Sequence, residues 1–345
     1  MSRGSRSRSR FASMATSTTA AGSGGEFELI ARHFGRASAR GARLGIGDDC
    51  ALLGDLPPGE CLAVSTDMLV AGRHFFDDVE PGALGWKALA VNLSDLAAMG
   101  ARPMACTLAL ALPAIDDRWL GAFAEGLLGL AACHGCELVG GDTTRGPLVI
   151  SITVLGSVAP ALALRRDAGR AGDDLWVSGP LGAAAWAVAR GLAGEPLPPA
   201  HPARQRLERP QPRVDLGRAL LGVARAAIDL SDGLLGDLGH VCERSGVGAR
   251  LDWPAIPVAE CLAELPLRER LAHALAGGDD YELLFTAPVQ ARATIEAMAL
   301  VDASSGAAVA PVRVGKLVAE PGIVLLDEQG TAMPLDGLAA FDHFR

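Results

Sequence analysis

The chain alternates between short apolar runs and longer segments in which apolar residues recur at helical spacing. Apolar or β-branched runs that end at glycine, proline or acidic residues are typical of strands. We expect strands at residues 61–67, 104–112, 148–158, 175–178, 312–318 and 323–326. Apolar residues three or four apart predict helices, and a segment that is apolar nearly all round predicts a buried helix. We expect helices at residues 26–36, 84–100 (buried), 119–132, 182–192 and 234–244.

This alternation of strand and helix predicts a layered α/β fold, and 345 residues are most simply divided into two domains. Residues 1–25 are rich in arginine and serine and have few apolar residues to bury, so we expect a disordered tail there. We interpret this tail as an extension upstream of a start at Met14. The domains are then expected over residues 26–158 and 159–345.

Glycine and proline separate the expected elements. Two adjacent carboxylates follow the glycines of residues 44–47, and glycine turns that carry aspartate are also expected at residues 140–146 and 277–280. Six prolines between residues 196 and 212 predict an irregular excursion in the second domain.

Composition narrows the class of protein. The formal net charge of −9 argues against a nucleic-acid surface, and no apolar run is long enough for a membrane span. Seven unclustered cysteines favour a reducing compartment, so we expect a cytoplasmic protein. With only 4% aromatic residues, the core has to be built from alanine, leucine and valine.

Acidic residues recur where predicted strands and turns end, with serine or threonine beside several of them. Oxygen donors without paired histidines favour Mg²⁺ over zinc, and several carboxylates suggest several ions. For any single aspartate, a role as the cap of a turn or helix is at least as good an explanation. The sequence has no P-loop, so phosphate would be held by metal, by backbone N–H groups at glycine turns and by arginines such as Arg145 or Arg166. The candidates are Asp49, Ser65, Thr66, Asp67, Asp95, Asp142, Asp229, Ser231 and Asp232.

Six motifs in order resemble the thiamine-monophosphate kinases of the aminoimidazole-ribonucleotide-synthetase-like superfamily. The motifs are GIGDDCALL (45–53), STD (65–67), AVNLSDLAAMGA (90–101), GGDTTRG (140–146), IDLSDGL (228–234) and GDDYEL (278–283). The resemblance implies ATP-dependent phosphorylation of thiamine monophosphate to thiamine diphosphate. It also implies an N-terminal α/β domain whose sheet pairs across a homodimer, and a C-terminal α/β domain.

The resemblance also implies roles for individual residues. The implied Mg²⁺ ligands are Asp49, Ser65, Thr66, Asp67, Asp95, Asp142, Asp229 and Asp232. The implied ATP contacts are Gly141, Asp142, Arg166 and Ser231. The implied substrate contacts are His74, Asp279 and Phe341.

Two of these substrate positions depart from the family pattern. The family commonly has glutamate where this chain has Asp279, and tyrosine or tryptophan where it has Phe341. A phenyl ring can stack on a cationic thiazolium but offers no hydroxyl. We expect no catalytic base, because the second pKa of a phosphate monoester lies near ~6 and the attacking oxygen is already ionised at neutral pH.

Three other classes of protein share parts of this pattern. ATP-dependent synthetases of the same superfamily, such as aminoimidazole ribonucleotide synthetase and selenophosphate synthetase, use similar acidic turns. Selenophosphate synthetase would have a reactive cysteine or selenocysteine near a glycine-rich N-terminus. A hydrogenase-maturation relative would end in cysteine, whereas this chain ends in Asp-His-Phe-Arg. A nucleotide-binding module would bind ATP without thiamine-dependent release of ADP.

Overall fold

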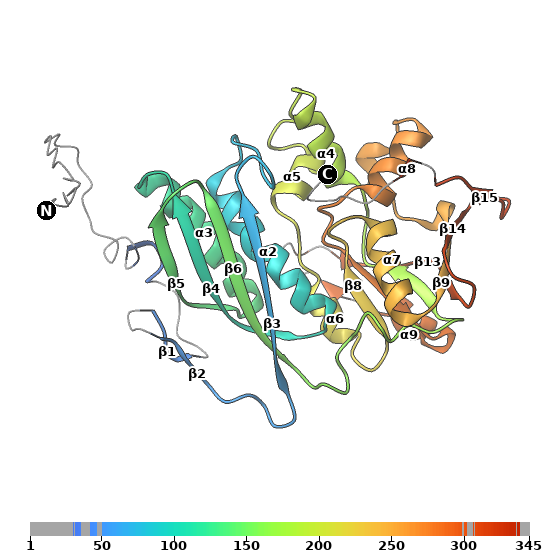
Figure 1. Cartoon of the computed structure of the whole chain (residues 1–345), viewed down its shortest axis with the longest axis horizontal. Helices are drawn as coiled ribbons and strands as arrows, with labels where there is room; N and C mark the ends of the chain where they lie inside the picture. Colours follow the sequence, from blue (N-terminus) through green and yellow to red (C-terminus); the bar gives the residue numbers. More distant parts are fainter. Residues whose placement is uncertain are drawn as a thin grey trace, which may run out of the picture.

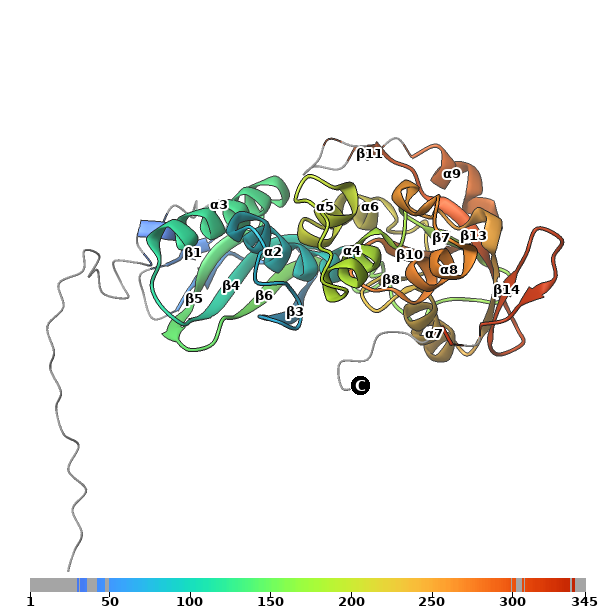
Figure 2. The ribbon, with the colours of Figure 1, turned by 90° about the horizontal axis from the view of Figure 1, so that it is seen from above.

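The computed structural model consists of two α/β units side by side (Figures 1 and 2). It describes residues 30, 32–35, 42–46, 50–298, 300–301, 306, 308–335 and 337–338. The expected tail, most of the expected helix at 26–36, and the residues Asp49 and Phe341 lie outside this part of the chain.

The N-terminal unit is a four-stranded sheet with helices on one face. The strand order is β3-β6-β4-β5, in which β6 is antiparallel to its neighbours and β4 is parallel to β5. Helices α2 and α3 pack side by side on the same face of the sheet (Figure 1). The elements are β1 (Ala42–Leu44), β2 (Leu52–Leu53), β3 (Cys61–Val70), α2 (Pro81–Ala98), β4 (Arg102–Leu112), α3 (Asp117–His134), β5 (Glu137–Arg145) and β6 (Val149–Val158).

Helix α2 is buried on nearly every side, as its uniformly apolar sequence predicts. Two glycines allow its close contact with α3. A Cβ on Gly85 would lie 2.0 Å from the carbonyl oxygen of Phe123, and a Cβ on Gly126 would lie 1.9 Å from that of Gly82. On its other side α2 contacts β8 and α6 of the second unit. One apolar core therefore extends from the first sheet through α2 to the second unit.

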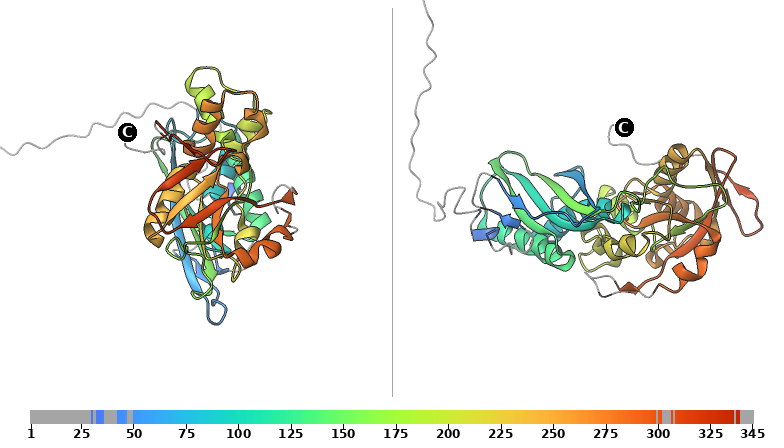
Figure 3. Two further views of the ribbon diagram at one scale, coloured as in Figure 1. Left: turned by 90° about the vertical axis from the view of Figure 1, so that its right-hand side faces the viewer. Right: turned by 90° about the horizontal axis from the view of Figure 1, so that it is seen from below.

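The C-terminal unit is built on a seven-stranded mixed sheet of order β15-β14-β9-β13-β7-β10-β8. Figure 3 shows its β14–β15 end (red) farthest from the N-terminal unit. The strands are β7 (Asp174–Val177), β8 (Ala226–Asp229), β9 (Gly248–Asp252), β10 (Leu283–Ala287), β13 (Val312–Val318), β14 (Ile323–Leu326) and β15 (Ala332–Met333). The helices are α4 (Ala183–Leu192), α5 (Pro202–Glu208), α6 (Val214–Ala219), α7 (Leu234–Ser245), α8 (Leu267–Ala276) and α9 (Arg292–Glu296), and a small separate sheet pairs β11 (Leu300–Val301) with β12 (Ala308–Val309).

Alternation along the second sheet divides its side chains between two cores. Trp176 and Phe285 stack in the core shared with α2, whereas Leu175, Val177 and Leu284 face the core formed with α7 and α8. Among the described residues, no helix is both long and apolar enough to cross a bilayer.

Two expectations about loops are wrong. Residues 137–145, in which we expected a turn at 140–146, form the strand β5, because parallel pairing with β4 provides partners for this backbone. A Cβ on Gly141 would lie 1.9 Å from the carbonyl oxygen of Leu108, so this glycine allows close approach of two strands and not a turn. The proline-rich excursion contains helix α5, which begins at Pro202, a position where proline is favoured because the first helical N–H groups have no partner in the helix.

Candidate active site

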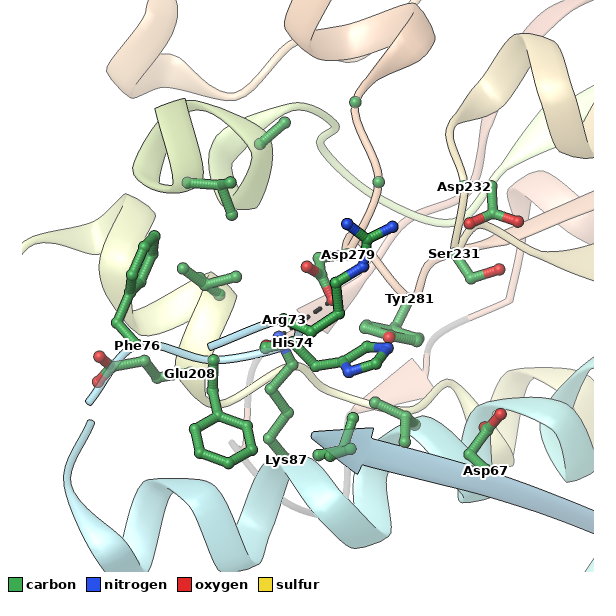
Figure 4. A pocket seen from close by; sticks show the side chains of 18 of the residues that line it. Asp67, Arg73, His74, Phe76, Lys87, Glu208, Ser231, Asp232, Asp279 and Tyr281 are labelled. Carbon is green, nitrogen blue, oxygen red and sulfur yellow. Dashed lines mark hydrogen bonds and ion pairs between the residues drawn. The ribbon is translucent and has the colours of Figure 1, made fainter. Parts of the chain in front are cut away.

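A cavity of about 920 Å³ lies where the two units meet. Its wall is formed by the end of β3 and the loop after it, by one face of α2, by α4, and by residues 229–232 and 276–281. Figure 4 shows Asp67, Ser231 and Asp232 toward one end of this cavity and Phe76, Lys87 and Glu208 toward the other. The volume falls in the range of small-molecule sites, and the two ends differ in chemistry.

At the acidic end, three carboxylates from different elements come together. Asp67 lies near the end of β3, Asp95 on α2 and Asp229 at the end of β8. Ser65 donates a hydrogen bond to Asp95 with an oxygen–oxygen distance of 2.5 Å, and the backbone N–H of Asp67 donates to the side-chain oxygen of Asn92 at 3.0 Å. Two of the carboxylates belong to the first unit and one to the second, so the cluster forms only when the units pack together.

Burial and mutual repulsion make these carboxyls reluctant to ionise. Burial, and next the charge of Asp95, raise the pKa of Asp67 to about 6 and that of Asp229 to about 8. Burial also raises the pKa of Asp95, although the Ser65 hydrogen bond and the charge of Arg166 act in the opposite direction. Buried carboxylates that lack a full set of cationic partners are stabilised when a cation binds between them.

The loop after β8 completes this end of the cavity. Ser231 and Asp232 line it, and their backbone N–H groups both donate to the carboxylate of Asp237 at 3.1 Å. Burial raises the pKa of Asp237 to about 7, and Arg166 acts electrostatically on both Asp95 and Asp237. Asp237 is not among the predicted site residues, and its only signal in the sequence is its place in the first turn of the helix that follows the Asp-Leu-Ser-Asp-Gly motif.

The donor set suits a hard divalent cation, because serine hydroxyl and carboxylate oxygens are the ligands that Mg²⁺ prefers. Within the described residues, however, no three histidine, cysteine, aspartate or glutamate side chains lie close enough as they stand to enclose a metal ion. The side chains would have to draw together around an ion, and substrate phosphates would supply its remaining ligands.

Three of the predicted site residues do not reach the acidic cluster of the same chain: Thr66, Gly141 and Asp142. Register places Asp67 of β3 in one row with Ile152, Leu108 and Gly141 across the sheet. The edge strands β3 and β5 are therefore three strand spacings apart, about 14 Å. Asp142, one residue after Gly141, projects from the opposite face of the sheet to Asp67.

Thr66 also projects from the face opposite Asp67, since it is the adjacent residue on the strand. Its hydroxyl is exposed and hydrogen-bonds that of Thr153 at 2.8 Å. The structure therefore does not bring the Thr66 hydroxyl, Gly141 or Asp142 to the acidic cluster of the same chain.

The other end of the cavity is apolar with a few charged groups. His74, Lys87, Glu208, Asp279 and Tyr281 lie there (Figure 4). The backbone N–H of Val70 donates to Nδ1 of His74 at 3.0 Å, an arrangement that assigns the proton of the neutral ring to Nε2. The apolar lining comes from Phe75, Phe76, Val79, Val188, Leu192 and Leu207.

Each charged residue of Asp279-Asp280-Tyr281-Glu282 contacts a different part of the fold. Asp279 pairs with Lys87 of α2, and the Asp280 carboxylate accepts two bonds of 3.0 Å from the backbone N–H of Gly182 at the start of α4. Buried Glu282 accepts from Ser178, Arg206 and Arg213 at 2.5–2.8 Å. Of these four residues, only Asp279 is among the predicted site residues.

The comparisons with known proteins agree with this arrangement. The family model for the AIR synthase related protein N-terminal domain matches residues 47–158, and the model for the C-terminal domain matches residues 170–326. The thiamine-monophosphate kinase of Salmonella typhimurium (strain LT2) is 48% identical over 280 residues, which are 79% of this chain and 85% of the relative. The chain belongs to the thiamine-monophosphate kinase family.

Solved structures of this family have the same fold. The thiamine-monophosphate kinase of Stenotrophomonas maltophilia K279a is 44% identical with a TM-score of 0.77, covering 89% of this chain and 96% of that one. The structure of AaThiL complexed with AMPPCP and TMP is 27% identical with a TM-score of 0.71, covering 85% and 90%. The family and the two-unit fold predicted from the motifs are thus confirmed.

Proposed function

We propose that this protein is an ATP-dependent, Mg²⁺-assisted kinase that phosphorylates thiamine monophosphate, giving thiamine diphosphate and ADP. The observation that carries the proposal is the cavity with two chemically different ends in a chain 48% identical to a thiamine-monophosphate kinase. The acidic end suits metal-bound phosphates, and the apolar end suits the rings of thiamine. A family member described in complex with AMPPCP and TMP supports the same pair of substrates.

The proposed transfer needs positioning more than proton removal. Mg²⁺ would be held by Asp67, Asp95, Asp229 and Asp232. Ser65 would orient Asp95 through its 2.5 Å hydrogen bond. When bound, Mg²⁺ would neutralise charge on the two phosphate chains and allow them to approach each other. Arg166 and Ser231 would contact ATP at this end, while His74 and Asp279 would hold the thiamine moiety at the other.

A direct assay tests this function. The purified chain is incubated with ATP, Mg²⁺ and thiamine monophosphate, or with thiamine instead, and products are identified by mass. We expect thiamine diphosphate and ADP in the reaction with thiamine monophosphate and not in the reaction with thiamine. Asp95→Asn should lower turnover at least about a hundredfold, because it removes charge from the phosphate end, whereas Glu320→Gln on an exposed turn should not. Release of ADP at the same rate without thiamine monophosphate, or equal turnover in Asp95→Asn and Glu320→Gln, would refute the proposal.

We further propose that the active form is a homodimer in which the N-terminal sheets face each other. The face of the sheet opposite α2 exposes Leu62, Val64 and Met68 at 45%, 58% and 54% of their surface. Exposed apolar side chains gathered on one face indicate an interaction surface. A second copy is the favoured occupant because both edge strands, β3 and β5, lack a partner on their outer side within this four-stranded sheet.

Dimerisation would also explain the separation of the predicted ligands. If two four-stranded sheets close into a barrel around a two-fold axis parallel to the strands, β5 of one copy adjoins β3 of the other. Gly141 and Asp142 of one chain would then lie beside Thr66 and Asp67 of the second chain, and a register offset by one residue would put the Asp142 carboxylate on the same face as Asp67. The site would thus draw residues from both copies.

Mixing two inactive variants tests this composite site. Asp67→Asn and Asp142→Asn should each be inactive alone. Random mixing makes half of the dimers hybrid, and each hybrid has one intact site of two, so activity should return to about a quarter of wild type. If Asp142 acts within its own chain, every site carries a substitution. Failure to regain activity, although hybrids are detected by native mass spectrometry, would contradict the composite site.

A further inference from the structure

Lys87 is a buried ammonium in the wall of the cavity, and the proposed transfer gives it no role. Its side chain is 2% exposed, and Nζ lies 3.0 Å from Oδ1 of Asp279 and 3.4 Å from the carbonyl oxygen of His74. A buried ammonium is costly unless it is paired and hydrogen-bonded. This pair also joins helix α2 of the N-terminal unit to residues 277–282 of the C-terminal unit.

Helix α2 fixes where Lys87 lies relative to the acidic cluster. Lys87, Val91 and Asp95 are spaced four residues apart, so they share one face of the helix, and all three line the cavity. Eight residues of α-helix span about 12 Å. One rigid, buried element therefore holds a carboxylate at the phosphate end of the cavity and a cation at the opposite end.

Asp279 is the more exposed member of the pair, at 29% of its side chain. Its backbone is in the left-handed region, with φ of 67°, and its N–H donates to the carbonyl oxygen of Ser231 at 2.9 Å. Lys87 thus holds this carboxylate, with part of its surface toward the cavity (Figure 4).

We propose that Lys87 is a positioning residue for thiamine monophosphate, acting through Asp279. This inference rests on the proposed function. Lys87 is too buried to offer much surface to a ligand, whereas Asp279 can meet the cationic or amino-bearing rings of the substrate. The ammonium pairs with the carboxylate at 3.0 Å and fixes its rotamer. This chain has aspartate where the family commonly has glutamate, so its shorter carboxylate depends on Lys87 for placement.

The expected consequence is a loss that is selective for one substrate. Without Lys87, the Asp279 carboxylate loses its cationic partner and can rotate away from the cavity. Binding of thiamine monophosphate should weaken, whereas ATP, placed about two helical turns away at Asp95, should bind as before. A lysine that only stabilises the fold would affect both substrates together.

The test compares Lys87→Met, Lys87→Arg, Asp279→Asn and the double variant Lys87→Met/Asp279→Asn in the full chain. Isothermal titration with thiamine monophosphate measures Kd, and steady-state kinetics give KM for each substrate. We expect Lys87→Met to raise the Kd for thiamine monophosphate at least about tenfold, equivalent to about 1.4 kcal/mol, with KM for ATP within about twofold. Lys87→Arg should restore most of the affinity, and the double variant should bind no worse than Asp279→Asn. Lys316→Met, on an exposed strand position, is the matched control.

Parallel losses for both substrates in Lys87→Met, or additive losses in the double variant, would overturn the positioning role. Titration needs no ATP, so a wild-type chain that binds thiamine monophosphate without phosphorylating it refutes the kinase function and still tests Lys87. A wild-type chain that does not bind thiamine monophosphate overturns both proposals.

Discussion

Asp229 should make the metal-free protein less stable as the pH rises. Its carboxyl is 4% exposed at the end of β8, close enough to Asp95 and Asp67 for their charges to act on it. Burial and these charges raise its pKa from 3.8 to about 8 in the folded chain. Between these values the folded state holds a proton that the unfolded state has released. Stability from this group is therefore fully present below about pH 3.8 and is lost as the pH rises toward 8.

The pKa difference sets the size of the effect. Each pKa unit corresponds to about 1.4 kcal/mol, so the contribution of Asp229 changes by roughly 3 to 4 kcal/mol between pH 5 and pH 8. Asparagine has nearly the same shape but does not titrate, so Asp229→Asn removes this dependence. In the presence of EDTA, the variant should be more stable than wild type at pH 8 by several kcal/mol, and the advantage should shrink at pH 5.

Urea unfolding followed by circular dichroism at pH 5, 6, 7 and 8 measures this difference. Glu320→Gln, on an exposed turn, should follow wild type at every pH. Addition of Mg²⁺ should raise the stability of wild type more than that of Asp229→Asn, because a cation that binds the folded state stabilises it. If wild type and Asp229→Asn lose stability in parallel from pH 5 to pH 8, the carboxyl is not buried among like charges and the reasoning fails.

Two further predictions concern packing and a buried ion pair. Gly126→Ala should destabilise the fold by about 1–3 kcal/mol, because the new Cβ would press on the carbonyl oxygen of Gly82 in α2. Gly129→Ala on the same helix meets open space and should be neutral or stabilising. Equal urea midpoints for the two variants would contradict this contact. Glu282→Gln should cost about 3–5 kcal/mol, because it leaves the buried Arg213 without its carboxylate. Burial raises the pKa of Glu282, but its arginine partners outweigh this and leave the pKa below 4.5. The stabilisation by the Glu282 carboxylate is therefore present above pH 4.5 and is lost at lower pH. Thermal melts in which wild type keeps its full advantage over Glu282→Gln down to pH 3 would refute this pairing.

Sequence alone was sufficient for the elements whose character is local. The continuous apolar segment that became α2 has only one stable environment, a buried one, and the strands at 312–318 and 323–326 agree with the structure. The family followed from six short motifs in order, because each preserves a turn or a row of oxygen donors at fixed spacing. These properties depend on neighbours within a few residues, and the chain itself carries them.

Tertiary structure decided which of these residues meet. The convergence of Asp67, Asp95 and Asp229, the separation of Asp142 and Thr66, and the partnership of Lys87 with Asp279 all depend on strand register and on how α2 packs between the units. Residues 140–145 belong to a strand because β4 lies beside them, although their glycines favour a turn. Propensity is set by a few neighbouring residues, whereas pairing and burial depend on segments far away in sequence, which no local pattern specifies.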